Sequence, residues 1–495
     1  MSSLAVIVFE SRNARISAAL LETLCASPLV GTILLVGDQE PDLELPDICR
    51  SVVEPNPQGG RCIEGLVACV RPCEYALIIT APEAVQITTA EIEAYYAAAV
   101  QTEAGMCYAD FFALERSDKA VRPLTCYQSG SIRDDFFFGC AYVLSLSRCR
   151  KALERFGALR ETVCSGLYEL RLKISRCALV VRIERPLYCV GKTDAGKAGH
   201  FDYVGRDHLA VQADMEAVAT EHLKGIGAYC AHPFLPVYAS RQGYPVDVSV
   251  VIPVRNRERT IGDAVKSALS QQTDFTFNVL VVQNHSTDRT GRVLEEIART
   301  DGRLVQIVPA QMDLGIGGCW NEAVCSAQCG RFVCQLDSDD LYKDEHSLAA
   351  MLAPLRSGEY GMAVGAYRLV DFDLQEIPPG IVDHREWTDG NGRNNLLRVQ
   401  GIGAPRAFVT ELVRRYPFPN VSYGEDYAVA LRITRDYRVA RLYEPVYLCR
   451  RWEENSDAGL SAEQENRYAE FKDGLRTSEI EERIAYNNQI RKNIY

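Results

Sequence analysis

Residues 248–271 read VSVVIPVRNRERTIGDAVKSALSQ, and this stretch decides the fold. Its apolar, β-branched start predicts a strand, the charged residues that follow predict a turn, and the later apolar spacing predicts an amphipathic helix. The same order recurs at residues 279–298, VLVVQNHSTDRTGRVLEEIA. Strands that alternate with helices indicate a mostly parallel sheet with helices on both faces. Both turns then lie at the carboxyl ends of strands, where open α/β sheets bind ligands.

The first half of the chain carries a second copy of this pattern. Residues 174–188 read ISRCALVVRIERPLY and residues 433–447 read ITRDYRVARLYEPVY, in step without a gap at an offset of 259. Near the start of each half, VIVFESRN at residues 6–13 parallels VVIPVRNR at residues 250–257. We therefore predict an internal duplication of one α/β domain.

The predicted organisation has four parts. Residues 1–195 and 246–455 form two tandem α/β domains with mostly parallel sheets. Residues 196–245 form a helical linker that begins with a Gly-rich loop, and residues 456–495 form a polar helical tail. A tail of this kind usually packs on the domain before it or on a second subunit, so a homo-oligomer is compatible with the sequence.

Charge and cysteine content exclude several classes of protein. The net charge of −12 and the pI near 5.3 disfavour nucleic acid as a partner, because nucleic-acid-binding surfaces are basic. The 18 cysteines are scattered and form no C-x-x-C pair, which favours free thiols in a reducing cytoplasm over disulfides or a zinc site. The apolar run at residues 4–9 is too short for a signal peptide or an integral membrane segment. We expect a cytoplasmic protein.

Acidic residues gather where one predicted strand ends. Residues 336–340 read LDSDD after an apolar run, and Asp337 and Asp339 point the same way from an extended backbone. Such acids can cap a following helix or stay solvated. A hard divalent cation also relieves their repulsion, since Mg²⁺ or Mn²⁺ binds through one or two carboxylates plus substrate phosphates.

Two further polar stretches have both a structural and a functional interpretation. Asn284 to Asp288 follow the second strand, where they form a turn and helix cap or contact a ligand. Glu425 and Asp426 open a helix after Gly424; there they complement the helix dipole, or one of them acts as a general base.

Together these segments resemble the family 2 glycosyltransferases, whose nucleotide-sugar-binding fold is called GT-A, over about residues 246–455. The resemblance lies in the order and spacing of VSVVIPVRN, VVQNHSTDRT, GIGGCWNEAV, FVCQLDSDD and the late GED before a helix. Residues 1–195 look like a second, eroded copy of that fold. The resemblance implies a metal-dependent, inverting glycosyltransferase that uses Mn²⁺ or Mg²⁺ and a nucleotide-sugar, with a UDP-sugar the expected donor. The implied acceptor is a saccharide or lipid-linked saccharide in surface glycan synthesis.

The resemblance also implies roles for single residues. Asp339 would ligate the metal that bridges the diphosphate. Asp426, with Glu425 beside it, would act as the base that takes the proton of the acceptor hydroxyl. The residues implied to contact the nucleotide or the donor sugar are Pro253, Arg255, Asn256, Asn284, Ser286, Asp337 and Ser338.

The sequence departs from the family pattern at two places. Where the family usually has an acid, this chain has Gln283-Asn284, although an amide oxygen still accepts a hydrogen bond from a base N–H. Trp320 stands where an Arg or Lys is common, so a cation on the phosphate side is missing. Arg451 and Trp452 are candidates to contact the diphosphate or a sugar instead, with a solvated basic patch as the alternative.

The first half lacks the corresponding acids. Residues 80–83, TAPE, stand opposite Asp337 to Asp340, and Gly166 and Leu167 stand opposite Glu425 and Asp426 at the offset of 259. We interpret residues 1–195 as a scaffold, dimerisation or acceptor-holding domain, with a divergent second active site as the alternative.

Two other functions fit parts of the pattern. A sugar nucleotidyltransferase shares the fold class, but it needs a Gly-rich phosphate loop after the first strand, and residues 253–257 contain no glycine. A non-catalytic nucleotide- or glycan-binding scaffold is the alternative from another class. The acids Asp337, Asp339 and Asp426 argue against it, because the first half keeps the strands without them.

Overall fold

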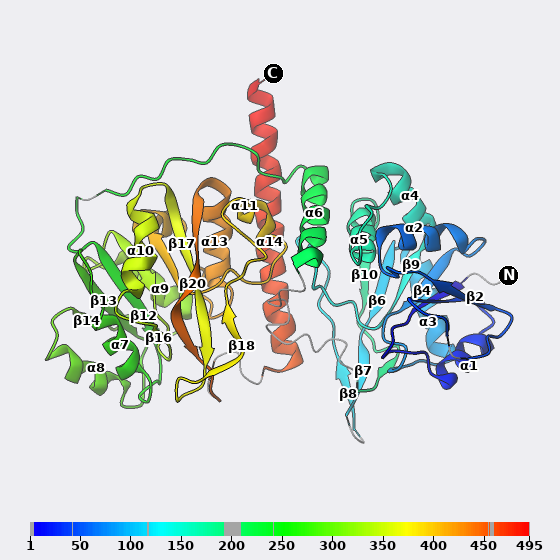
Figure 1. Cartoon of the computed structure of the whole chain (residues 1–495), viewed down its shortest axis with the longest axis horizontal. Coiled ribbons are helices and arrows are strands. Elements are labelled where there is room, and N and C mark those ends of the chain that lie inside the picture. Colours follow the sequence, from blue (N-terminus) through cyan, green and yellow to red (C-terminus); the bar gives the residue numbers. More distant parts are fainter. Residues whose placement is uncertain are drawn as a thin grey trace. The chain divides into compact units, whose positions relative to one another are not determined.

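The computed structural model describes residues 4–41, 43–115, 118–192, 209–240, 242–453, 455 and 460–494. The chain divides into two compact units: Met1–Tyr229 with Leu460–Tyr495, and Cys230–Gly459 (Figure 1). Both are α/β structures and the chain ends in a long helix, which confirms the predicted fold class. Among the described residues, no helix is long and apolar enough to cross a membrane.

The first unit begins with β1, a strand whose six residues are all buried. Its strands are β1 (Leu4–Phe9), β2 (Val30–Gly37), β3 (Cys49–Val53), β4 (Tyr75–Ile79), β5 (Val85–Gln86), β6 (Met106–Ala109), β7 (Phe111–Glu115), β8 (Asp118–Arg122), β9 (Ala141–Ser145), β10 (Val180–Ile183) and β11 (Cys189–Val190). Its helices are α1 (Ala18–Ala26), α2 (Gly60–Cys69), α3 (Thr89–Thr102), α4 (Leu146–Phe156), α5 (Gly166–Ser175), α6 (Leu209–Ile226) and α14 (Ala462–Ile494).

The second unit begins with the strand and helix of the opening sequence motif, β12 and α7. Its strands are β12 (Val248–Val254), β13 (Phe277–Gln283), β14 (Leu304–Ile307), β15 (Phe332–Gln335), β16 (Leu341–Tyr342), β17 (Tyr360–Val370), β18 (Glu376–Val382), β19 (Arg406–Val409) and β20 (Arg438–Arg450). Its helices are α7 (Ile261–Leu269), α8 (Thr290–Ala298), α9 (Ile316–Cys325), α10 (Ser347–Arg356), α11 (Gly392–Asn395), α12 (Thr410–Arg415) and α13 (Glu425–Asp436).

The large sheets of the two units share one strand order. The first runs β3-β2-β1-β4-β9-β6-β10, and the second runs β14-β13-β12-β15-β19-β17-β20 and continues to β16. In both, the first four strands pair in parallel and the last two of the shared order do too. The fifth strand, β9 or β19, runs antiparallel to both of its neighbours. The sheets are therefore parallel where the first sequence motifs lie and mixed beyond them.

A close backbone contact recurs in the two units. A Cβ atom on Gly60 of α2 would lie 2.0 Å from the carbonyl oxygen of Arg160, and one on Gly317 of α9 would lie 1.9 Å from that of Pro419. Arg160 and Pro419 are separated by the same 259 residues as the matching sequence segments. Only glycine allows the helix and the loop to approach so closely.

The tail helix α14 packs on the first unit. Arg122 Nη2 lies 2.8 Å from Glu465 Oε2. The fully buried Asp473 accepts a hydrogen bond of 2.8 Å from Ser131 Oγ and lies 3.3 Å from Arg133 Nε. A buried carboxylate needs such partners, and here the first unit supplies them, which a reading of the tail alone could not predict.

The helix of the predicted linker also belongs to the first unit. Helix α6 packs against α5, and Arg176 Nη2 donates a 3.0 Å hydrogen bond to the carbonyl oxygen of Gly225. The Gly-rich loop predicted at the start of the linker lies outside the described residues.

Two substitutions in α2 test the close approach of helix and loop. Gly60→Ala should lower the free energy of unfolding of the first unit by about 1–3 kcal/mol, because the methyl group meets the Arg160 carbonyl oxygen. Gly65→Ala, whose Cβ meets no described atom within 4 Å, should raise it by up to about 1 kcal/mol because alanine is the better helix former.

Hydrogen exchange of peptides from β1 and β4 measures this stability within the first unit. Equal protection of the backbone amides of these peptides in both variants would contradict the predicted contact between residue 60 and the Arg160 carbonyl oxygen.

Candidate active site

Three loops of the second unit meet at one edge of its sheet. Strand β12 pairs in parallel with β13 on one side and with β15 on the other, so the residues after all three strands lie at the same edge. Nearly every residue of these strands is buried. Apolar burial thus fixes where the polar residues after them are displayed.

Hydrogen bonds join the loops after β12 and β13. Asn256 Oδ1 accepts a 2.7 Å hydrogen bond from the backbone N–H of Thr287, and Ser286 Oγ accepts one of 3.0 Å from that of Asn256. Asp288 Oδ2 accepts a third from the N–H of Glu258 at 3.0 Å. Asn256 has a φ of +54°, which asparagine tolerates better than most residues. The structure therefore brings Asn256 and Ser286 together, and both residues hold the two loops to each other.

The other residues expected near the nucleotide lie on the same strand ends. Pro253 is part of β12 and partly buried, and Arg255 is exposed just after it. Asn284 is buried; its Nδ2 donates a 2.8 Å hydrogen bond to the carbonyl oxygen of Leu314. In the described part of the chain its Oδ1 has no partner. The amide therefore has one buried oxygen acceptor without a partner among the described residues.

The acids after β15 have different surroundings. Gln335 Nε2 donates to both oxygens of Asp337, at 2.9 and 3.1 Å. Burial raises the pKa of Asp337, and the charges of Asp339 and Asp426 add to the effect. Asp340 is buried and accepts a 2.8 Å hydrogen bond from the backbone N–H of Arg450; burial, with the charges of Asp339 and Asp337, raises its pKa well above the usual range. Ser338 is buried between these acids.

Asp339 is surrounded by N–H donors. Its Oδ2 accepts hydrogen bonds from Trp452 Nε1 at 3.1 Å and from Asn455 Nδ2 at 3.3 Å, and Arg257 Nε lies 3.9 Å away. The structure thus brings the sequence candidate Trp452 to the candidate metal ligand. The other candidate, Arg451, donates its backbone N–H to the carbonyl oxygen of Val370 at 2.8 Å.

The acids at this edge fit one kind of metal site only. The described residues contain no cluster of three or more His, Cys, Asp or Glu side chains that would enclose an ion. A cation held by one or two carboxylates, with the remaining ligands supplied by a diphosphate, fits Asp339 and the neighbouring Asp337. The site is therefore suited to bind metal together with substrate.

Arginine and aromatic side chains surround Asp339 on the side of Trp452. The Trp452 and Phe372 rings are 5.4 Å apart, and the Arg259 guanidinium lies 5.3 and 5.5 Å from their centroids. Arg257 lies 5.6 Å from Trp452. Trp320, which stands where a cation is common in the family, is buried and stacks on the core residue Phe418. The cations near Asp339 come from the charged run RNRER after β12 and from Arg450 of β20, whose Nε donates a hydrogen bond to the Asp339 carbonyl oxygen.

The candidate base lies at the start of α13. Gly424 has a φ of +80° and begins the helix, so Glu425 and Asp426 occupy its first turn. Asp426 forms an ion pair with Arg406 of β19, and its Oδ1 accepts a 2.6 Å hydrogen bond from the N–H of Tyr427. Burial, reinforced by the charge of Asp426, raises the pKa of Glu425 to about 8. The two adjacent acids therefore have different environments.

Several residues of the site were not predicted from the sequence, and Gln335 and Arg406 are the two that contact each other. Arg406 Nε donates a 2.9 Å hydrogen bond to Gln335 Oε1. Each is a polar residue within an apolar strand segment, FVCQL and PRAFV, and that is the local signal that points to them. Buried polar side chains of this kind have partners, but the sequence alone does not name the partner.

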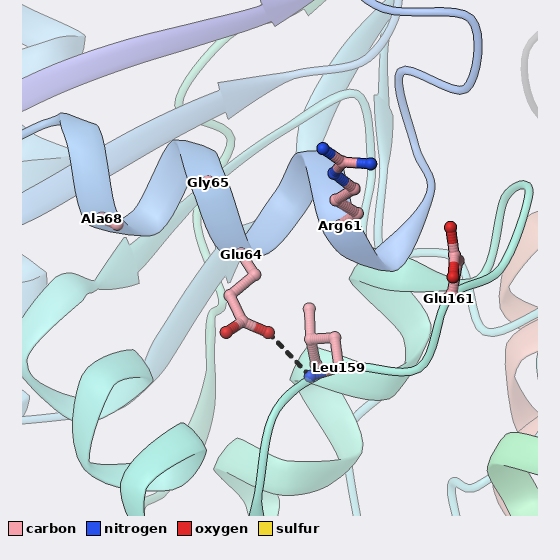
Figure 2. A pocket seen from close by; sticks show the side chains of 6 residues that line it. All are labelled: Arg61, Glu64, Gly65, Ala68, Leu159 and Glu161. Carbon is pink, nitrogen blue, oxygen red and sulfur yellow. Dashed lines mark hydrogen bonds between the residues drawn. The ribbon is translucent and has the colours of Figure 1, made fainter.

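Hollows elsewhere on the surface do not coincide with these residues. One of about 570 Å³ in the first unit is lined by Arg61, Glu64, Gly65, Ala68, Leu159 and Glu161. Figure 2 shows Glu64 within it, and its carboxylate accepts a 2.8 Å hydrogen bond from the Leu159 N–H. None of its lining residues stands opposite Asp337 to Asp340 or opposite Glu425 and Asp426. The candidate active site is therefore located by its carboxylates.

The raised pKa of Glu425 predicts a pH-dependent stability. As pH rises from about 4.5 to about 8, the unfolded chain loses the Glu425 proton before the folded protein does, so the free energy of unfolding falls over this window. Glu425→Gln cannot ionise and should lack this loss, so it should gain on the wild type by on the order of a few kcal/mol between pH 5 and pH 8.

Denaturant unfolding followed by tryptophan fluorescence reports the second unit, which holds all three tryptophans. Parallel stability curves for the wild type and the variant would contradict the prediction.

Comparison with known proteins identifies the domain that holds this site. Residues 249–418 match the profile of glycosyl transferase family 2. UDP-Glc:alpha-D-GlcNAc-diphosphoundecaprenol beta-1,3-glucosyltransferase WfgD of Escherichia coli is 28% identical over 197 residues, which are 39% of this chain and 72% of that protein. Glycosyltransferase AglD of Haloferax volcanii is 31% identical over 140 residues, 28% of this chain and 22% of that protein.

Among solved structures, S. aureus TarS 1–349 in complex with UDP-GlcNAc is 21% identical with a TM-score of 0.36, covering 48% of this chain and 72% of that one. The chain thus spans only part of each of these proteins. The family profile covers the segment from β12 to β19. The second unit of this chain is a family 2 glycosyltransferase domain.

Proposed function

We propose that the second unit catalyses a metal-dependent, inverting transfer of a sugar from a UDP-sugar to a hydroxyl of a saccharide or lipid-linked saccharide. One observation carries the proposal: acids from two distant segments gather at one edge of the sheet in different environments. Asp339 is surrounded by N–H donors, whereas Asp426 is paired with Arg406. A displacement with a charged leaving group and a proton to remove needs two such groups.

The base-binding end of the site favours uracil or guanine as the base of the donor. Because Asn284 Nδ2 is bonded to Leu314, its Oδ1, which is buried and has no partner among the described residues, is the proposed acceptor for a ring N–H. Uracil and guanine carry such an N–H, whereas cytosine and adenine present a ring acceptor there. The name of the relative WfgD specifies a UDP-Glc donor and a diphosphoundecaprenol-linked acceptor, which supports a UDP-sugar and a lipid-linked saccharide here.

The proposed reaction is a single displacement. The acceptor hydroxyl oxygen bonds to the anomeric carbon while the bond from that carbon to the diphosphate oxygen breaks. The electron pair of the broken bond leaves with the nucleoside diphosphate, and the hydroxyl proton passes to Asp426. Attack from the face opposite the leaving group inverts the anomeric centre. A positioned general base of this kind contributes roughly 10²–10⁴ in rate.

Negative charge grows on the diphosphate as it leaves. Asp339, with Asp337 nearby, would hold Mn²⁺ or Mg²⁺, and when bound the cation supplies Lewis-acid stabilisation of that charge. Arg257, 3.9 Å from Asp339, and Arg259 place further positive charge at the same end of the site. Trp452 Nε1 and Asn455 Nδ2 orient the Asp339 carboxylate through their hydrogen bonds.

The first unit is proposed to be a copy of the same fold without the chemistry, and to act as a scaffold or acceptor-holding domain. The shared strand order and the shared glycine contacts support a duplication. The loss of matching acids at residues 80–83 supports a non-catalytic role. The free cysteines support a reducing, cytoplasmic location.

A donor panel tests the proposed function. UDP-, GDP-, ADP- and CDP-sugars are offered with Mn²⁺ or Mg²⁺, and release of the nucleoside diphosphate is measured. The wild type should turn over a UDP-sugar, and Asp426→Asn should be slower by at least about 10²-fold because its amide cannot accept the proton. Glu295→Gln, which removes an exposed carboxylate of α8, is the matched control and should keep full activity.

If no donor is bound or turned over in the presence of metal, the transferase proposal fails. If Asp426→Asn is as active as the wild type, the base is another residue.

A further inference from the structure

Arg406 is a charged residue in a strand whose other residues are buried. Strand β19 reads RAFV, and Ala407, Phe408 and Val409 are at most 1% exposed. The Arg406 side chain is itself only 13% exposed. A guanidinium in such a place is costly unless it is paired and hydrogen-bonded. The partners of the Arg406 guanidinium therefore indicate its role.

The partners of Arg406 connect both acidic parts of the active site. Its Nη1 forms an ion pair with Asp426 of α13, and its Nε donates a 2.9 Å hydrogen bond to Gln335 Oε1 of β15. The Nε2 of the same glutamine donates to Asp337 at 2.9 and 3.1 Å. A continuous chain of hydrogen bonds thus runs from the acid after β15, through Gln335 and Arg406, to the first turn of α13.

Several titratable groups face this guanidinium. They include Asp426 and Glu425 on α13, Asp337 after β15 and Tyr447 on β20. Burial alone lowers the pKa of Arg406, but the charge of Asp426, followed by those of the others, leaves it raised. Without a cation here, the three carboxylates would compete to share protons, and none would be reliably free to accept one.

We propose that Arg406 is the positioning residue of the transfer reaction: anchored to Gln335, its guanidinium holds the Asp426 carboxylate ionised and oriented toward the acceptor hydroxyl. This inference rests on the proposed function of Asp426 as base. It adds a residue that acts through Asp426 and does not itself touch the reacting atoms. A fixed guanidinium restricts the carboxylate to one rotamer, which is what orientation of a base requires.

The first unit provides an internal comparison. In the second unit, β15 and β19 pair with Val333 opposite Phe408 and Cys334 opposite Ala407, so the next pair in this register is Gln335 and Arg406. In the first unit the corresponding strands pair Ile78 with Tyr142. Leu167 stands where Asp426 stands in the second unit. Glutamine, arginine and base are therefore replaced together, as expected if they work as one unit.

The pH dependence of turnover tests this role. The rate kcat/KM for the UDP-sugar should fall at low pH where the base becomes protonated. In Arg406→Gln that acidic limb should move up by about 1–3 pH units, because a neighbouring arginine lowers the pKa of an aspartate by that amount. The KM for the donor should stay within about twofold, and the loss in kcat should be largest at low pH and smaller at high pH.

Two further variants separate charge from geometry. Arg406→Lys keeps the positive charge and should move the limb less than Arg406→Gln does. Gln335→Met removes the anchor and keeps the arginine; it should lower kcat with the limb unmoved. Binding of UDP, measured by calorimetry, verifies that each variant is folded. If Arg406→Gln does not bind UDP, the pH profile of Arg406→Lys is used for the test instead.

The outcomes distinguish this inference from the function on which it rests. If Asp426→Asn retains full activity, the assignment of the base fails. If Asp426→Asn is inactive but Arg406→Gln keeps the wild-type pH profile, only the role of Arg406 is overturned. A lysine variant whose limb moves as far as that of the glutamine variant would also overturn it, since the charge would then not be responsible.

Discussion

The parallel pairing of β12 with β13 and β15 is the constraint on which the site depends. Each of these strands is buried, so apolar packing sets their order and register, and the residues after them have to meet at one edge. Asn284 and Asp339 are far apart in the sequence but are displayed together for this reason. The function of the edge then depends on which polar residues stand there, because the first unit has the same strand order with other residues.

The acids at this edge differ in their surroundings because each has different hydrogen-bond and ion-pair partners. In the described part of the chain, N–H donors surround Asp339 Oδ2, whereas Asp340 is buried against the backbone of Arg450. Asp426 forms an ion pair with a guanidinium, whereas burial dominates at its neighbour Glu425 and raises the pKa of that carboxyl. Similar carboxylates can thus serve as metal ligand, structural acceptor and base. Clustered charge of this kind costs stability, which a binding or catalytic role explains better than folding does.

The parts of the structure that were predicted from sequence depend on local signals. Alternating strands and helices, and acids placed just after an apolar run, predicted the sheets and the positions of Asp337 and Asp339. The pairing of Arg406 with Gln335 depends on a reversed strand, β19, which lies between β15 and β17. No periodicity of the sequence encodes that insertion. Two other contacts join distant residues and were not predicted for the same reason. Trp452 contacts Asp339 across 113 residues of sequence, and Asp473 of the tail forms an ion pair with Arg133 in the first half of the chain.

Binding of Mn²⁺ in the presence of UDP tests the central claim most directly, because it reports on the acids without requiring the correct sugar or acceptor. Electron paramagnetic resonance measures free and bound Mn²⁺ in the wild type, in Asp339→Ala and in Glu83→Ala, which removes the one acid of the matching first-unit segment TAPE. We expect the wild type and Glu83→Ala to bind Mn²⁺ equally and Asp339→Ala to bind it at least about tenfold more weakly, a change of about 1.4 kcal/mol. Equal binding by Asp339→Ala, or no binding by the wild type with UDP present, would contradict the account.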